Sequence, residues 1–316
     1  MISARVVSRT RDAQDVVRIE LEAADGGSLP AFTAGSHIDL NLGNGLIRQY
    51  SLCGSPDACD RYRIAVLREP DSRGGSRFVH DALTPGVLVD ISSPRNLFDL
   101  REDSETYVLV AGGIGITPIL AMAYRLSALG KAYVLHYCAR DPARAAFLDE
   151  LATHPLAGHV QLHFDTDAQT RLDLDQVLAG PSPDRRLYVC GPTGFMDYVL
   201  EGATQRGWAA GQVHREYFSG PKSDAAADRA FDLIIASTGQ TLTVGPGQTA
   251  AKVLEAADVF VPLSCEQGIC GTCLTSVLEG TPDHRDLFQT DEEKATNAQF
   301  TPCCSRAHSA TLVLDL

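Results

Sequence analysis

The sequence lacks the features that would place this chain in a membrane, in an export pathway or on nucleic acid. None of its apolar runs reaches the roughly 20 residues that cross a bilayer, and residues 1–15 contain no apolar core of a signal peptide. An excess of basic residues is also missing, because 40 Asp and Glu against 27 Lys and Arg give a formal net charge of −13. These absences argue against nucleic acid and membranes as partners and favour a reducing cytoplasm.

The chain has room for several domains, and its cysteines are unevenly distributed. Its 316 residues, 44% of them hydrophobic, are enough for two or three domains with sizeable cores. Nine cysteines without an export signal indicate metal or redox chemistry more than disulfides. Five of the nine lie at or beyond position 265, so this chemistry is expected near the C-terminus.

The periodicity of the sequence changes along the chain and predicts three domains. Residues 1–101 alternate short apolar strands with turns, as in a small antiparallel barrel. Residues 102–222 alternate strands with helices, one of them expected over 143–154, which predicts a parallel sheet covered on both faces. Residues 223–230 are a polar, Ala-rich linker. Residues 231–316 combine short strands, one helix and most of the cysteines.

The cysteine series predicts an iron–sulfur cluster. Cys265, Cys270 and Cys273 have the C-x4-C-x2-C spacing of a plant-type 2Fe–2S site. Such a site needs four thiolates around two irons, and the glycines inside this series allow a tight loop. A zinc site more often pairs two CxxC-like knuckles. The fourth ligand is Cys303 or Cys304, and the spacing alone does not choose, because neighbouring side chains of a strand face opposite sides.

Two glycine turns in the second segment predict a nucleotide site. Each turn follows a strand and opens a helix, and helix N-termini bind phosphates. Ligands of open parallel sheets lie outside the carboxyl ends of the strands, so both turns are expected to flank one crevice. A plain strand–helix turn and a small buried cysteine are the alternatives. The first turn comprises Gly112, Gly113, Gly115, Thr117 and Pro118, and the second comprises Cys190, Gly191 and Pro192.

A flavin is expected in the barrel, because a hydride carries two electrons and a 2Fe–2S cluster accepts one at a time. Arg48 suits a phosphate, Tyr50 can stack on a flavin ring, and Ser51 can donate to its edge. An ordinary strand with alternating polar residues is the alternative. A short helix start adds amide groups for a phosphate. It comprises Arg73, Gly74, Gly75 and Ser76.

Together these motifs resemble the phthalate dioxygenase reductase family, within the ferredoxin–NADP reductase superfamily. The resemblance covers nearly the whole chain, through R-x-Y-S at 48–51, GG-x-G-x-TP at 112–118, CGP at 190–192 and the cysteine series. It implies an antiparallel flavin-binding β-barrel, a doubly wound parallel-sheet nucleotide domain and a β-grasp ferredoxin domain. It also implies FMN, NADH and a 2Fe–2S cluster as cofactors.

The resemblance also implies roles for single residues. In that family the fourth cluster ligand stands three residues before the Arg of a C-x-S-R sequence, which is Cys303 here. Hydride transfer is expected near Thr117, Cys190 and Phe218, with no side chain acting as an acid or a base. Further flavin contacts are expected from Ala65, Val66, Glu216 and Phe218.

The choice of nucleotide depends on the residues that follow the strand ending near position 139. Asp141 suits the free ribose of NADH, as in the family, whereas Arg140 and Arg144 would suit the extra phosphate of NADPH. We expect NADH, and the mixture leaves NADPH open.

The resemblance implies a reductase that is a monomer and passes electrons to an oxygenase with a Rieske centre and non-haem iron. A cytochrome P450 or a di-iron monooxygenase is the alternative partner. A non-catalytic redox-sensing module is the alternative of another class. Residues 221–316 hold 13 Asp and Glu against 6 Lys and Arg, which favours a basic patch on the partner.

Overall fold

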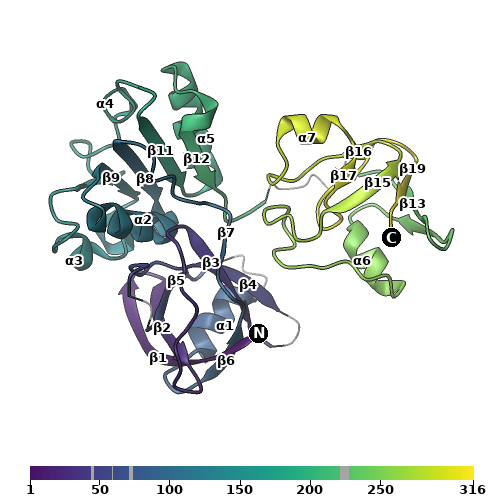
Figure 1. Cartoon of the computed structure of the whole chain (residues 1–316), viewed down its shortest axis with the longest axis horizontal. Coiled ribbons are helices and arrows are strands. Elements are labelled where there is room, and N and C mark those ends of the chain that lie inside the picture. The colour runs from purple at the N-terminus through teal and green to yellow at the C-terminus, as the bar shows by residue number, and fades with distance from the viewer. Residues whose placement is uncertain (44–45, 59, 71–73, 221–227) are drawn as a thin grey trace. The chain divides into compact units, whose positions relative to one another are not determined.

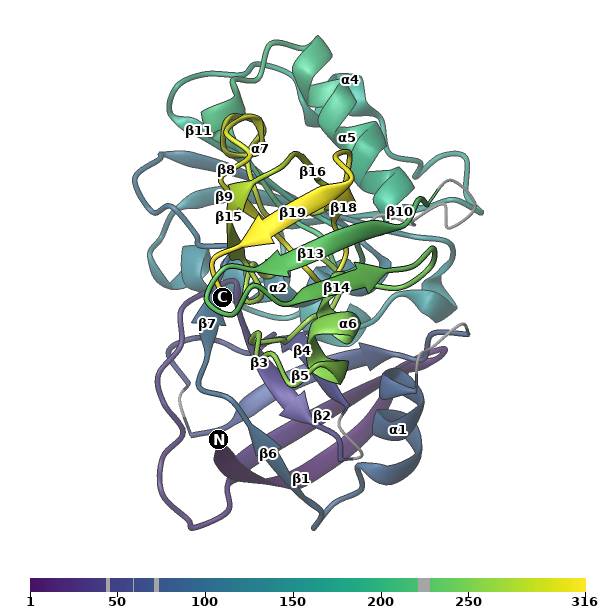
Figure 2. The same ribbon diagram turned by 90° about the vertical axis from the view of Figure 1, so that its right-hand side faces the viewer.

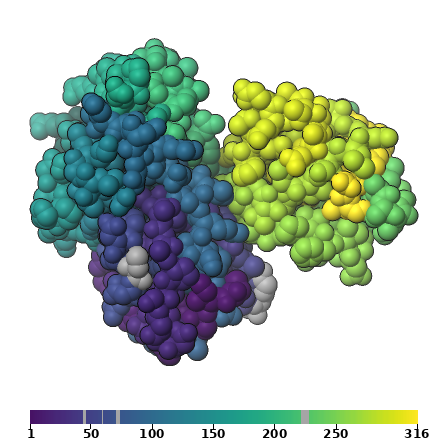
Figure 3. Space-filling model, in the orientation of Figure 1, coloured from purple at the N-terminus to yellow at the C-terminus, as the bar shows by residue number. Residues whose placement is uncertain are grey.

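The chain folds into two compact units, Met1–Glu216 and Tyr217–Leu316, whose atoms Figure 3 colours by residue number. The first unit has two apolar cores and the second has one among the described residues. The structure is a computed structural model, and it describes residues 1–43, 46–58, 60–70, 74–220 and 228–316. Among the described residues, no helix is both long enough and apolar enough to cross a membrane.

The first unit begins with an antiparallel barrel (Figure 1). Its strands lie in the order β4-β3-β6-β1-β2-β5, with β7 beside β3. The two end strands, β4 and β5, meet where Cys53 N donates to Arg63 O at 2.9 Å. The elements are β1 (Ile2–Ala13), β2 (Val16–Ala23), β3 (Ser36–Asn41), β4 (Ile47–Ser51), β5 (Tyr62–Leu67), α1 (Gly75–Ala82), β6 (Leu88–Ile91) and β7 (Arg95–Asn96).

The rest of the first unit is a five-stranded sheet, entirely parallel, in the order β10-β9-β8-β11-β12. The strand order reverses between β8 and β11, and both strands are buried apolar runs, as central parallel strands are. The elements are β8 (Thr106–Gly112), η1 (Gly113–Gly115), α2 (Ile116–Ala128), β9 (Ala132–Ala139), η2 (Pro142–Arg144), α3 (Leu148–Leu151), β10 (Val160–Phe164), α4 (Leu174–Val177), β11 (Arg185–Cys190), α5 (Thr193–Gln205), η3 (Ala210–Gln212) and β12 (Val213–Glu216).

The helix expected over residues 143–154 is wrong in its extent. The segment contains only the end of η2 and the short α3, because Phe147 adopts φ +64° between them. The N–H groups of Ala146 and Phe147 donate to Tyr137 Oη at 2.9 Å and Asp12 Oδ2 at 2.6 Å. Tertiary partners therefore replace the hydrogen bonds that a continuous helix would make.

The second unit has the β-grasp arrangement (Figure 2). Its sheet has the order β14-β13-β19-β15-β17, with β13 and β19 parallel and the other pairs antiparallel. The elements are β13 (Phe231–Ile235), β14 (Thr241–Val244), α6 (Ala250–Ala256), β15 (Thr275–Glu279), β16 (Pro282–Asp283), α7 (Asp291–Ala295), β17 (Gln299–Phe300), β18 (Arg306–Ala307) and β19 (Thr311–Leu314).

Candidate functional site

The cysteine loop lies between α6 and β15, outside the helices and strands of the second unit. Gly268 and Gly271 adopt φ +73° and +67°, the left-handed region that glycine enters most easily. The backbone N–H groups of Gln267 and Ile269 donate to Cys265 Sγ at 3.4 and 3.5 Å. The loop therefore directs amides at a sulfur, as expected where thiolate charge has to be stabilised.

The sulfurs of the predicted ligands meet in two pairs. A hydrogen bond from Cys265 lowers the pKa of Cys270 to about 5, and one from Cys303 lowers the pKa of Cys273. Among the described residues, no group of three or more Cys, His, Asp or Glu surrounds a single point. Two irons with two cysteine ligands each need pairs, so this donor set fits a 2Fe–2S cluster better than one tetrahedral metal ion.

Cys303 and Cys304 have different surroundings, although their sulfurs also interact with each other. Cys303 is buried beside Cys273. Cys304 Sγ lies 3.2 Å from Thr301 Oγ1 and only 2.4 Å from where a Cβ on Gly268 would be. These contacts favour Cys303 over Cys304 as the fourth ligand.

The two predicted glycine turns of the nucleotide domain touch each other. A Cβ on Gly115 would lie 2.3 Å from Cys190 O, and one on Gly191 would lie 3.1 Å from Gly112 Cα. Both turns follow the carboxyl ends of β8 and β11, at the reversal of strand order, where open α/β sheets bind ligands. Thr117 is buried, and its hydroxyl donates to Ile114 O at 3.0 Å, so it helps to shape the first turn.

Glu216 connects the barrel to the end of the nucleotide sheet. It stands opposite Cys190 in the β11–β12 pair, and Ser51 Oγ of β4 donates to its Oε2 at 3.4 Å. Burial by surrounding protein atoms raises the pKa of Glu216 to about 8, although the residue keeps intermediate exposure. Burial also raises the pKa of the Cys190 thiol. The structure therefore brings two predicted flavin residues beside a residue of the predicted hydride site, while Phe218, in the second unit, stays a prediction.

The predicted flavin residues come from the two end strands of the barrel sheet. Arg48, Tyr50 and Ser51 belong to β4, and burial raises the pKa of Tyr50. Ala65 and Val66 belong to β5 and have buried side chains, so they can offer mainly backbone groups. The carbonyl of Val66 already contacts a ring nitrogen of the buried His80 at 2.9 Å.

The start of α1 lies beside Arg48. A Cβ on Gly75 would lie 2.6 Å from Arg48 Cγ and 3.0 Å from Arg48 Nε. Gly74 precedes the helix with φ +100°, and Ser76 Oγ accepts from Glu69 N at 3.1 Å. A guanidinium beside a helix N-terminus suits one phosphate group. Arg73 lies outside the described residues.

Asp141 has a local structural role that its sequence position does not reveal. Its Oδ1 accepts from Arg144 N at 3.1 Å, which caps η2, and its Oδ2 lies 3.5 Å from Arg144 Nε. Arg140 is exposed at the end of β9. Because the Asp141 carboxylate already binds Arg144, the residue alone is weaker support for NADH than its position in the sequence suggests.

Comparison with known proteins identifies the family. The profile of the 2Fe-2S iron-sulfur cluster binding domain matches residues 233–308. A vanillate O-demethylase oxidoreductase from Pseudomonas sp. is 53% identical, over 100% of both chains. A solved phthalate dioxygenase reductase, described as transferring electrons from pyridine nucleotides to a 2Fe–2S centre, is 38% identical with a TM-score of 0.79, covering 100% of this chain and 98% of that one. The chain belongs to the phthalate dioxygenase reductase family.

A second solved structure matches this chain within a longer protein. An intact type IV self-sufficient cytochrome P450 monooxygenase matches 100% of this chain and 41% of its own, with 38% identity and a TM-score of 0.84. These findings confirm the expected family, the expected fold class and an iron–sulfur oxidoreductase.

A partly buried ion cluster, which the sequence did not indicate, lies between the barrel and the nucleotide domain. Arg63 of β5 donates to both oxygens of Glu150 in α3, at 3.0 and 2.6 Å. Tyr124 of α2 also donates to Glu150, and Arg18 lies 3.4 Å from it. No local motif marks these residues, because they are far apart in the sequence and meet only in the folded unit.

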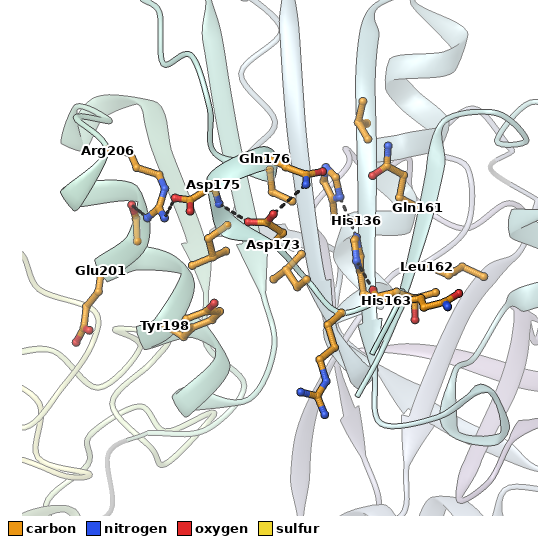
Figure 4. A pocket seen from close by; sticks show the side chains of 18 of the residues that line it. His136, Gln161, Leu162, His163, Asp173, Asp175, Gln176, Tyr198, Glu201 and Arg206 are labelled. Atoms are coloured by element: carbon orange, nitrogen blue, oxygen red, sulfur yellow. Dashed lines mark hydrogen bonds and ion pairs between the residues drawn. The ribbon is translucent and has the colours of Figure 1, made fainter. Parts of the chain in front are cut away.

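A cavity of about 1240 Å³ has none of the predicted site residues in its lining; Figure 4 shows the side chains that line it. It is on one face of the parallel sheet, between β9, β10, α4 and α5, whereas the glycine turns lie at the strand ends. His136 Nδ1 and His163 Nε2 are 3.0 Å apart at its floor, and His163 Nδ1 lies 2.8 Å from Thr170 O. The histidines thus have protein partners, as a structural pair would.

Proposed function

We propose that this chain is the reductase component that carries electrons from NADH, through FMN and a 2Fe–2S cluster, to a Rieske non-haem iron oxygenase. The observation that carries the proposal is the full-length 53% identity to a vanillate O-demethylase oxidoreductase. Two further observations support it. The Ser51–Glu216–Cys190 contact lies where electrons would pass from the nucleotide to the flavin, and the paired cysteines would hold the cluster from which electrons leave the chain.

The first unit contains two of the three cofactor sites. We assign residues 1–101 to FMN and 102–222 to NADH, followed by a linker at 223–230. Residues 221–227 lie outside the described ones. Arg48 and the start of α1 hold the FMN phosphate, while the β4 and β5 edges and Glu216 contact its ring. When bound, the flavin accepts a hydride and passes electrons on singly.

The chain's own contribution at the nucleotide is close approach and orientation. A side chain on Gly113 would meet open space, so the backbone there is open to the pyrophosphate, whereas glycine at 112, 115 and 191 lets the two turns pack closely against each other and Phe195. The helix N-terminus at the start of α2 adds amide groups for a phosphate. Cys190 is held as a neutral thiol by its burial, so it adds no negative charge beside the nicotinamide. Thr117 shapes the turn through its own hydrogen bond.

Within the second unit, we assign residues 231–316 to the cluster, which Cys265, Cys270, Cys273 and Cys303 hold. Cysteine thiolates at these positions need a reducing compartment, and we propose the cytoplasm. We also propose that the chain is a monomer. The excess of acidic residues favours a basic docking patch on the oxygenase. A cytochrome P450 is the second candidate partner, because a self-sufficient P450 contains a region that matches this whole chain.

An anaerobic NADH titration of the purified protein tests the electron path. The visible spectrum should contain overlapping flavin and iron–sulfur bands, and NADH should bleach both. Protein that lacks the flavin band, or keeps its colour with NADH, contradicts the proposal.

Turnover with a purified Rieske oxygenase and with a P450, assayed side by side, tests the partner class. Faster electron delivery to the P450 would reverse our assignment. Electron transfer that is unchanged by high salt would exclude electrostatic steering.

A further inference from the structure

Residues 286–288 lie against the cysteine loop at both of its positive-φ glycines. Leu287 N donates to Gly268 O at 2.9 Å. A Cβ on Gly268 would lie 3.0 Å from Asp286 Cα, and a Cβ on Gly271 would lie 2.4 Å from Phe288 Cζ. Neither glycine therefore leaves room for a side chain, and the segment supports the loop from one side.

Within this segment, Asp286 connects the loop to the turn that contains Cys303. Its side chain is fully buried, and its Oδ2 accepts from Gln289 N at 2.8 Å. Its Oδ1 lies 3.4 Å from Thr301 Oγ1 and 3.5 Å from Ser305 Oγ. These two hydroxyls stand on either side of Cys303, and Ser305 N donates to Thr301 O at 2.9 Å. One carboxylate thus contacts both ends of the turn.

The charge of Asp286 is only weakly compensated, although burying a carboxylate is costly. Lys294 Nζ donates to the backbone oxygen of Asp286 at 2.7 Å and not to its carboxylate, and Arg285 binds two other carboxylates. Among the described residues, the one ion-pair contact of the Asp286 carboxylate is with His284, whose Nδ1 lies 3.9 Å from Asp286 Oδ1. Both ring nitrogens of His284 are buried without a hydrogen-bond partner among those residues. Local stability is therefore a poor explanation for a carboxylate here.

We propose that Asp286 is a positioning residue for the iron–sulfur cluster: it holds the Cys303 turn against the Cys265–Cys273 loop and lowers the reduction potential of the cluster between them. This rests on the proposed function, because it requires the cluster. The reduced cluster carries one more negative charge than the oxidised one. A fixed negative charge beside it therefore disfavours reduction.

Asp286→Asn in the full-length holoprotein tests the electrostatic part. We expect the midpoint potential of the cluster to rise, with about a tenfold change in the one-electron equilibrium constant, or ~59 mV. Asp291→Asn is the matched control, because it removes the same charge from an exposed position in α7 of the same unit. A spectroelectrochemical titration followed by electron paramagnetic resonance measures both, and the control should not shift.

Thr301→Val tests the positioning part and keeps the charge. The variant is nearly isosteric but cannot bond to Asp286, so the cluster should be lost to a chelator about tenfold faster. Thr301→Ser restores the hydroxyl and should behave as the wild type. If the Asp286→Asn protein does not fold, the comparison of Thr301→Val with Thr301→Ser still tests whether the contact with Asp286 positions the cluster.

Equal potentials in the two Asn variants, or equal cluster loss in the two Thr301 variants, would overturn the inference. If the wild-type protein contains no iron–sulfur centre, the proposed function fails and the inference fails with it. If the wild type contains the centre but the variants are indistinguishable from it, only the inference fails.

Discussion

The two units build their cofactor sites in opposite ways. In the first unit, most predicted flavin and nucleotide residues stand at the edges and carboxyl ends of strands, and only Ala65, Val66 and Cys190 among them belong to its apolar cores. In the second unit, the predicted ligands stand in a loop and a turn, and Cys273 and Cys303 are themselves part of the apolar core. A site on the surface of a packed sheet can be empty without cost to the fold, whereas a site within a small core cannot.

Separate serine substitutions at Cys303 and Cys304 should show the largest effect. Cys303→Ser should abolish the cluster and lower the melting temperature of the second unit, because it removes a ligand from that core. Cys304→Ser, the matched control, should keep the cluster. Iron content, visible absorption and thermal melts measure both. Cluster loss in the Cys304 variant alone would exchange the two assignments.

A substitution at the ion cluster tests whether the stability of the first unit depends on the contact between the barrel and the nucleotide domain. Glu150→Gln should destabilise that unit by about 3 kcal/mol, because it leaves the largely buried Arg63 without its charge partner. Urea unfolding followed by flavin fluorescence measures the change.

Glu102→Gln provides the comparison for that measurement. It breaks a more exposed pair with Arg125 and should cost less than about 1 kcal/mol. If both variants lose the same free energy of unfolding, the Arg63–Glu150 pair contributes no more to stability than the more exposed Arg125–Glu102 pair.

Alanine at Gly115 tests the contact between the two nucleotide turns. The added Cβ would meet Cys190 O at 2.3 Å and separate the turns, and we expect flavin reduction by NADH to slow by about a hundredfold. Gly211→Ala is the control, because its Cβ meets open space in the same domain, its φ is not in the left-handed region, and it lies in η3 outside both turns. Stopped-flow reduction distinguishes them, and similar rates would contradict a role for the contact.

The smallest expected effect is a dependence of stability on pH through Glu216. Its folded pKa of about 8 lies above the ordinary 4.5, so between these values the folded state binds more protons than the unfolded state. The stability of the first unit should therefore fall as pH rises from 5 to 8. Over this range the full shift would correspond to roughly 3–4 kcal/mol, and because Glu216 keeps intermediate exposure to solvent, we expect about 1–2 kcal/mol. Glu216→Gln should flatten that part of a urea-midpoint profile, and an unchanged slope would assign it to another group.

Local sequence motifs predicted the candidate site residues better than they predicted the tertiary contacts between those sites. The helix expected from the short helix start at positions 73–76 and the helix expected after the first glycine turn exist as α1 and α2. The helix over 143–154 was wrong, because Asp12 and Tyr137 capture backbone groups that a sequence pattern treats as helical. Arg63 and Glu150 had no sequence signal, since two isolated charges far apart predict nothing until the fold joins them.

The sequence by itself determined which chemistry this chain can contain. Cysteine spacing, glycine turns and the R-x-Y-S motif are local patterns, and local backbone geometry is enough to make them specific. Only the tertiary structure decided which groups stand together. Ser51, Cys190 and Glu216 meet because strand pairing brings distant segments into contact. The buried Asp286 carboxylate accepts from Gln289 N and lies beside the hydroxyls of Thr301 and Ser305, which belong to the Cys303 turn. Such contacts depend on the packing of the whole unit, and no short stretch of sequence encodes them.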